Sequence, residues 1–297
     1  MFNVNEFKLG LVEDVARLVD ARNKYHEAVN ALHALGKNAP RQSSLECLPV
    51  ALSNLLKSRF EDVDAELTAS YCYGYPIEIK TSECYFEYDD WRHSQGHYLT
   101  QKLYQEILRA DEKKSPFEQV QLLEGVIHRM PWEKIKEHLD HQVNNVKNAG
   151  MAAAVRKVNT FFGLTSPRLD RFSVTKRGLV CSKGYDGTGY SLHDYARKFE
   201  DVLEALKPIA EESNINLGSG FFDLCEALWT NARTSKAIPL RTRFGKGSAV
   251  DVTVFTSKIN MVISFPLLEA IQAATLIYGS EEEAGNIMKL MEHVEAA

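Results

Sequence analysis

The sequence predicts an α+β fold, with a mainly helical N-terminal part followed by a small antiparallel sheet packed with helices. In the first part, apolar residues recur at helical spacing over residues 5–35 and are followed by Gly36 and Pro40. In the second part, short segments rich in β-branched and aromatic residues alternate with glycine-containing turns. These observations predict a mainly helical domain at residues 1–150 and an α+β domain at residues 151–297.

The N-terminal part contains three further signals. The helical pattern over residues 5–35 fits either one long helix or a kinked pair, and residues 77–88 alternate as a small hairpin. Ser115-Pro116-Phe117-Glu118 has the spacing of a capping box with proline at the first helical position. Pro131 precedes a helix over residues 132–150, and residues 151–162 continue or follow it.

The C-terminal part contains the predicted strands. We expect a strand over residues 172–181 with a turn or bulge at Gly178, and a helix from Ser191 to Lys207, just before Pro208. Residues 221–231 have helical spacing. Residues 239–244, 250–255 and 259–264 are expected to be strands. Two helices follow, and the second is capped by Ser280 and Glu283.

Composition limits the class of protein. The chain has 297 residues, of which 44% are hydrophobic and 25% charged, which is typical of a globular core. It contains no apolar run of the roughly 20 residues that span a bilayer, and its N-terminus lacks a signal-peptide pattern. Its five cysteines are scattered without C-x-x-C spacing, so we expect free thiols in the core. The sequence thus predicts a cytoplasmic protein without membrane association.

Positive charge is concentrated in two segments although the net charge is −5. Residues 156–183 contain seven Lys or Arg and one acid, Asp170, while residues 233–258 contain six and one acid, Asp251. The two segments together carry +11, and the rest of the chain carries −16. If they meet in space, they form a local basic face.

Basic and aromatic residues alternate in these segments, as they do in grooves that bind nucleic acid. The same composition also occurs on an ordinary sheet with one buried face. The candidates for nucleic-acid or partner binding are Arg171, Lys176, Arg177, Lys183, Arg241, Arg243, Phe244 and Lys246.

The glycine-rich stretch CSKGYDGTGYSLHD, residues 181–194, raises the question of a phosphate loop. Its lysine precedes the glycines, and Gly184-x-x-Gly187-x-Gly189 reverses the dinucleotide-binding order. We therefore expect a turn between a strand and a helix. A phosphate on the helix N-terminus at Ser191, assisted by Lys183, is the alternative.

Metal and catalytic patterns are weak. His93 and His97, and the pair His138 and His141, are expected to be solvated rather than ligands. Asp251 and Lys258 match two of the three positions of a nuclease motif, but the middle acid is missing, so Asp251 is expected to face solvent in a hairpin. The sequence therefore predicts no catalytic residue, no metal and no cofactor, and it favours a non-enzymatic protein.

Three stretches, RFSVTKRGLV, YARKFEDVLEAL and RTRFGKGSAVDVTVF, resemble a bacterial family of domains of unknown function. That family is carried by plasmids, prophages and phages, sometimes near or joined to DNA methyltransferase modules. The resemblance covers roughly residues 97–279. It retains Phe244, Lys246 and Gly247 of the family's turn but lacks an Asn and a His found there. It implies a mobile-element protein acting in the cytoplasm of a bacterial host, and it supplies no catalytic residue.

Together these features support one hypothesis and two alternatives. The first is a non-enzymatic phage or mobile-element protein that binds and inhibits a host, defence-related protein complex, with homo-oligomer formation as a further expectation. The second is a nucleic-acid-binding accessory protein that uses the two basic segments. The third is a metal-dependent nuclease that uses Asp251.

Overall fold

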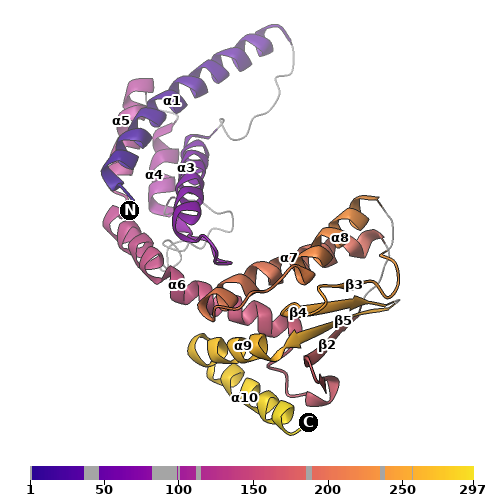
Figure 1. Ribbon diagram of the computed structural model, residues 1–297. Helices are drawn as coiled ribbons and strands as arrows, with labels where there is room; N and C mark the ends of the chain where they lie inside the picture. The colour runs from indigo at the N-terminus through magenta and orange to yellow at the C-terminus, as the bar shows by residue number, and fades with distance from the viewer. Residues whose placement is uncertain are drawn as a thin grey trace. The chain divides into compact units, whose positions relative to one another are not determined.

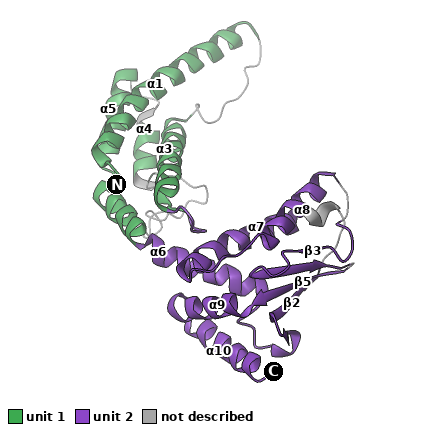
Figure 2. Cartoon of the chain, viewed as in Figure 1, with its two compact units in different colours: residues 1–71, 78–144 green, residues 72–77, 145–297 purple. Residues whose placement is uncertain are grey.

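The computed structural model confirms the α+β class and has two compact units, residues 1–71 with 78–144 and residues 72–77 with 145–297 (Figure 2). Helix α6, Trp132–Phe162, begins in the first unit and ends in the second. The structure describes residues 2–36, 47–81, 99, 101–111, 115–184, 189–234, 238–255 and 257–297. Within these ranges, no helix is both long enough and apolar enough to cross a membrane.

The first unit is helical, as predicted. Its helices besides the start of α6 are α1 (Val4–Ala34), α3 (Leu48–Tyr71), α4 (Gln101–Asp111) and α5 (Pro116–His128) (Figure 1). The long pattern at the N-terminus is one helix, because α1 is continuous and ends just before Gly36, whose φ is +67°. Ser115 and Glu118 form the predicted capping box of α5.

The core of this unit is partly aromatic. Phe7 packs against Phe60 and Trp132, with ring centroids 5.1 and 5.9 Å away. The Trp132 indole N–H donates a hydrogen bond of 2.7 Å to the Ile127 carbonyl, so its polar atom is satisfied inside the core. These contacts join α1, α3 and α6 around one apolar centre.

The predicted hairpin at residues 77–88 is described only as far as residue 81, and residues 77–81 form no strand. Side chains of α3 and α6 instead bond to part of their backbone, with Gln142 of α6 bonded to both the N–H and the carbonyl of Lys80. The Ile79 N–H donates to Thr68 Oγ1 at 2.9 Å, and the Thr81 N–H donates to Asp64 Oδ1 at 2.8 Å. The rest of the hairpin lies outside the described residues.

The second unit contains an antiparallel sheet with strand order β1-β2-β5-β4-β3. The strands are β1 (Ser173–Thr175), β2 (Gly178–Gly184), β3 (Arg243–Phe244), β4 (Val250–Val254) and β5 (Lys258–Ser264). The remaining elements are the 3₁₀ helix η2 (Leu169–Arg171) and helices α7 (Gly189–Glu212), α8 (Gly220–Thr234), α9 (Phe265–Tyr278) and α10 (Glu281–Glu295) (Figure 1).

The two faces of this sheet differ. One face is apolar and buried, with Leu179, Val252 and Met261 at its centre, and α8 and α9 pack against the strands. The other face, which we call the open face, carries side chains that are mostly exposed or half-buried. Its members are Ser173, Val180, Ser182, Arg243, Asp251, Thr253, Asn260 and Val262. This alternation is the period-two pattern of an antiparallel sheet with one buried side.

Several element ends differ from the predictions. The first turn of the sheet lies at Lys176 and Arg177 rather than at Gly178, which is already paired with Thr175. The strand predicted over residues 239–244 is reduced to β3, because Arg241 has a φ of +64° that interrupts extended backbone.

The helix predicted to end before Pro208 also differs. Helix α7 continues through Pro208 to Glu212, because the buried side chains of Ile209 and Ala210 hold that turn against the core. It begins at Gly189, two residues before the predicted start at Ser191, and the Ser191 side chain lies outside the described part. The strand and the helix expected on either side of the glycine-rich stretch are both present.

Candidate functional site

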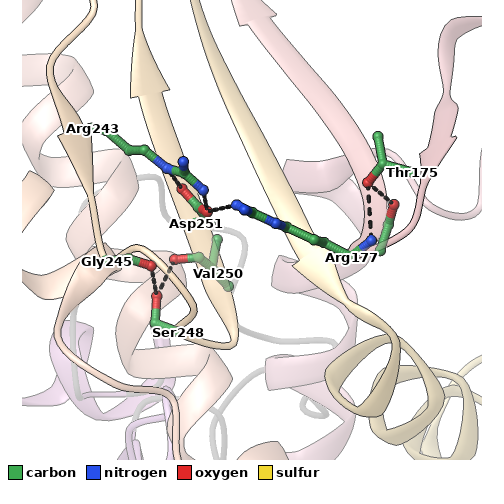
Figure 3. A network of polar contacts seen from close by, with 8 residues as sticks. Thr175, Arg177, Arg243, Gly245, Ser248, Val250 and Asp251 are labelled. Carbon is green, nitrogen blue, oxygen red and sulfur yellow. Dashed lines mark hydrogen bonds and ion pairs between the residues drawn. The ribbon is translucent and has the colours of Figure 1, made fainter.

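The open face is organised around the carboxylate of Asp251 on β4, whose side chain is only 7% exposed. Arg243 Nε on β3 donates to Asp251 Oδ1 at 2.8 Å, and Arg243 Nη2 donates to Oδ2. Arg177 Nη1 donates to the same Oδ2 at 3.4 Å (Figure 3). We call Arg177, Asp251 and Arg243 the arginine–aspartate cluster.

Sheet geometry explains why these residues meet. Arg243 lies opposite Thr253, so Asp251 is the diagonal neighbour of Arg243 on the same face of the β3–β4 pair. Arg177 lies in the turn between β1 and β2, and its extended side chain reaches across the sheet toward Asp251 (Figure 3). The cluster therefore connects the first basic segment with the second.

Gly178 permits the close strand pairing beside Arg177. It pairs with Thr175 on one side and with Ser264 on the other. A Cβ atom at this position would lie 1.8 Å from the Ile263 carbonyl oxygen, so no larger residue fits without moving backbone. The turn that carries Arg177 is thus held against β5.

The turn between β3 and β4 fixes the other side of the cluster. Gly245 and Gly247 have φ values of +62° and +85°, and Ser248 Oγ lies 2.7 Å from the Gly245 carbonyl oxygen and 2.8 Å from that of Val250 (Figure 3). A Cβ on Gly245 would lie 2.2 Å from the Cα of Gly220. Because this turn packs directly on the start of α8, β3 has little freedom to shift.

The cluster carries a net positive charge, since two guanidinium groups share one carboxylate. The pKa of Arg243 is raised, first by its hydrogen bond to Asp251 and then by the attraction of that charge. The Arg177 and Arg243 side chains are 56% and 36% exposed. Each guanidinium has five N–H donors, so both retain donors that face solvent.

The position of Asp251 corrects the expectation that it faces solvent. It is buried because Arg243 and Arg177 cover its carboxylate. Both carboxylate oxygens accept from guanidinium groups, which disfavours the use of this residue as a Mg²⁺ ligand. The glycine turn between Arg243 and Asp251 was a local signal for their pairing, but no local pattern indicated that Arg177 would reach the same carboxylate.

The other predicted residues occupy different places. Arg171 and Lys183 line one cavity at the end of α6. Lys176, Arg241 and Lys246 are exposed on turns. These five therefore do not belong to the arginine–aspartate cluster.

Phe244 is partly buried and packs against the apolar core of the second unit. Its neighbour Arg243 faces the opposite side of the sheet, as the alternation of a strand requires. The Phe244 ring is therefore used for packing, so it is poorly placed to stack on a base.

The basic residues also lie at the two edges of the sheet. Edge strand β1 pairs through three residues and is followed by Lys176 and Arg177, while β3 pairs through two and includes Arg243. Short, charged edge strands disfavour the addition of another strand. A partner is thus more favourably accommodated on the open face than by extension of the sheet.

The predicted histidine pairs supply no metal centre in what the structure describes. His138 and His141 lie on α6, while His93 and His97 fall outside the described ranges. Across those ranges, no group of three or more His, Cys, Asp or Glu side chains is placed to hold a metal ion. Four of the cysteines, Cys47, Cys72, Cys181 and Cys225, are free thiols, and Cys84 is not described.

Comparisons with protein-family models, with curated proteins and with solved structures gave no match for this chain. The resemblance carried by the three stretches named above stays a prediction.

Proposed function

We propose that this chain is a non-enzymatic phage or mobile-element protein that binds and inhibits a host, defence-related protein complex. The open face of the sheet is its contact surface. The observation that carries the proposal is the arginine–aspartate cluster, in which a buried carboxylate holds two arginine side chains at a solvent-facing surface.

Ordered arginines are effective binding groups. A free arginine side chain loses about 0.5–1.5 kcal/mol of conformational entropy when a partner immobilises it. Asp251 has already restricted Arg177 and Arg243, so less entropy remains to be lost on binding. Arginine is also enriched among the residues that dominate the affinity of protein interfaces. The cluster therefore favours a partner with an acidic surface.

The surroundings of the cluster favour a protein partner over single-stranded nucleic acid. Neighbours on the open face include Ser182, Thr253 and Asn260, which donate and accept hydrogen bonds without offering a stacking surface. The nearby aromatic side chain of Phe244 packs against the core instead. Platforms for single-stranded nucleic acid rely on exposed aromatic faces.

A nucleic-acid-binding accessory protein is the second candidate. One observation favours it: both basic segments contribute strands to the same sheet and meet at Asp251. Such binding would depend mainly on phosphate contacts and would weaken steeply with salt. A nuclease is not favoured, because the guanidinium groups occupy both oxygens of Asp251.

The proposal is tested by affinity purification of the tagged protein from a bacterial lysate with and without nuclease treatment. Bands are identified by mass spectrometry, and absorbance is measured at 260 and 280 nm. A stoichiometric host protein that survives nuclease treatment, and whose activity falls when this protein is added, supports the proposal. A nuclease-sensitive signal at 260 nm without a protein partner favours the second candidate. Light scattering on the purified chain tests the expected homo-oligomer.

A further inference from the structure

A cavity of about 400 Å³ lies in the second unit, between the end of α6, the loop that follows it and β2. It is separate from the arginine–aspartate cluster. Its size falls within the range of small-molecule sites. The lining residues that matter here are Asn159, Phe162, Ser166, Arg171, Ser182 and Lys183.

Two cations in this cavity rest on aromatic rings. Arg171 lies 5.2 Å from the centre of the Phe172 ring, and Lys183 Nζ lies 5.0 Å from the centre of the Phe161 ring. As far as the chain is described, neither makes an ion pair with a carboxylate. The pKa of Lys183 is lowered, chiefly by burial and then by the charge of Arg171. Two neighbouring cations without an ion pair among the described residues favour an anion.

The position of Arg171 is built into the fold. Its Nη2 donates a hydrogen bond of 2.6 Å to the Gly163 carbonyl oxygen, at the end of α6. Gly163 has a φ of +71°, and a Cβ there would lie 2.4 Å from Arg171 Nη2. The glycine thus leaves the space that the guanidinium occupies, so this cation is placed by the loop.

Asn159, one of the residues that line the cavity, carries a buried acceptor. Asn159 is fully buried, and its Nδ2 donates to Thr275 Oγ1 at 3.1 Å. Thr275 Oγ1 itself donates to the Ile271 carbonyl at 2.7 Å, which fixes the orientation of the amide. Asn159 Oδ1 has no hydrogen-bond partner among the described residues. A buried acceptor without a donor is unfavourable, so a ligand that donates to it gains affinity.

We propose that this cavity binds a small phosphate monoester that also carries a hydrogen-bond donor, of the class of a free nucleoside monophosphate. Arg171 and Lys183 hold the phosphate, and the hydroxyl of Ser166 is available as a further donor, whereas that of Ser182 already donates to Asn260 Oδ1 at 2.8 Å. Asn159 Oδ1 accepts from a hydroxyl or amino group of the ligand. Ser182 of the open face lines this site, but no residue of the arginine–aspartate cluster does, so variants of the two sites can be tested separately.

The test is calorimetric titration of the full-length protein with adenosine monophosphate, inorganic phosphate and a 5′-phosphorylated hexanucleotide. Adenosine monophosphate is expected to bind, at least tenfold more tightly than inorganic phosphate. Arg171→Gln and Lys183→Met, made separately, are each expected to weaken binding at least tenfold. Arg156→Gln and Lys157→Met, at exposed positions on α6, are the matched controls.

Thermal unfolding of each variant checks that it folds. If only one of the two cavity variants folds, its binding is compared with that of the wild type. The inference would be overturned if the wild-type protein showed no saturable binding of adenosine monophosphate. It would also be overturned if both cavity variants bound adenosine monophosphate as tightly as the wild type. Inorganic phosphate binding as tightly as the nucleotide would overturn the assignment to a monoester. Tighter binding of the hexanucleotide, by tenfold or more, would overturn the assignment to a free nucleotide.

Discussion

Arg243 and Asp251 lie eight residues apart on neighbouring antiparallel strands, and Arg243 Nε donates to Asp251 Oδ1 at 2.8 Å. Arg177, 74 residues away from Asp251 in the sequence, reaches the other oxygen. One carboxylate thereby joins the two basic segments of the chain. The binding function that we propose depends on that junction.

Replacement of the carboxylate tests how much the cluster contributes to stability. Asp251→Asn is expected to lower the free energy of unfolding by about 1–3 kcal/mol, because hydrogen bonds to charged groups are lost at a buried position. Urea denaturation followed by circular dichroism measures this change. Glu226→Gln, at an exposed position on α8, removes the same charge and is expected to change stability by less than about 0.5 kcal/mol. Equal stability of the two variants would show that the cluster is not structural.

Gly178 and Gly184 lie at the two ends of β2 and allow a matched comparison. Gly178→Ala is expected to destabilise the protein by about 3 kcal/mol or more, because its Cβ would overlap the Ile263 carbonyl oxygen. No atom of the described residues lies within 4 Å of a Cβ built on Gly184, so Gly184→Ala is expected to be nearly neutral. The urea midpoints of the two variants decide between these outcomes. A stable Gly178→Ala protein would contradict the strand pairing described for β2 and β5.

Two of the helix starts, those of α5 and α10, could be predicted from sequence because their signals are local. The capping boxes of α5 and α10 depend on residues three apart, Ser115 with Glu118 and Ser280 with Glu283, and both are confirmed. The end of α7 could not be predicted in this way. Local sequence placed it before Pro208, whereas burial of the residues that follow carries the helix onward.

The candidate site was predictable only as a list of residue types. Arg177 and Arg243 were recognised as binding candidates from composition, but their meeting at Asp251 depends on strand order, which local patterns do not determine. The cavity was missed for a similar reason. Asn159 and Lys183 come together only when the end of α6 lies beside β2.

The thiol of Cys181 offers a prediction about pH. Burial raises its pKa to about 12 from an ordinary value of 9.0. At a pH between these two pKa values, the thiol is deprotonated in the unfolded chain but protonated in the folded protein. This thiol therefore makes the free energy of unfolding fall as the pH rises above about 9. In Cys181→Ala, the loss of stability between pH 8 and pH 10.5 is expected to be smaller than in the wild type. If Cys181→Ala and the wild type lost the same stability over this pH range, the raised pKa of Cys181 would be contradicted.

The same burial should protect Cys181 from modification. At pH 8 in the native protein, Cys181 is expected to react with a disulfide reagent far more slowly than the partly exposed Cys47, because thiolate is the reactive form. Mass spectrometry of the labelled peptides measures each site separately. In 6 M guanidinium chloride the two rates should converge. Rapid native labelling of Cys181 would place it outside the core.

The nucleic-acid alternative predicts a salt effect at the edge of the sheet. Arg241→Gln, Arg243→Gln and Lys246→Gln, combined in one protein, should weaken binding to duplex DNA if these residues contact phosphates. The slope of log affinity against log salt concentration should then decrease in magnitude by about 2–3, since each phosphate contact contributes roughly 0.9. Fluorescence anisotropy over a range of salt concentrations measures both quantities. Unchanged binding and slope would exclude this edge as the contact.

The central claim is tested most directly by comparing the amount of host partner captured by the wild-type protein with the amount captured by charge-matched variants. Arg177→Gln leaves Arg243 on Asp251, and the double variant Arg177→Gln/Arg243→Gln removes both cations from the open face. The control Arg156→Gln/Lys157→Gln removes two exposed cations from α6. The account predicts that capture falls at least tenfold in the double variant, partly in Arg177→Gln and not in the control, with all three proteins folded. Full capture by the folded double variant would contradict it.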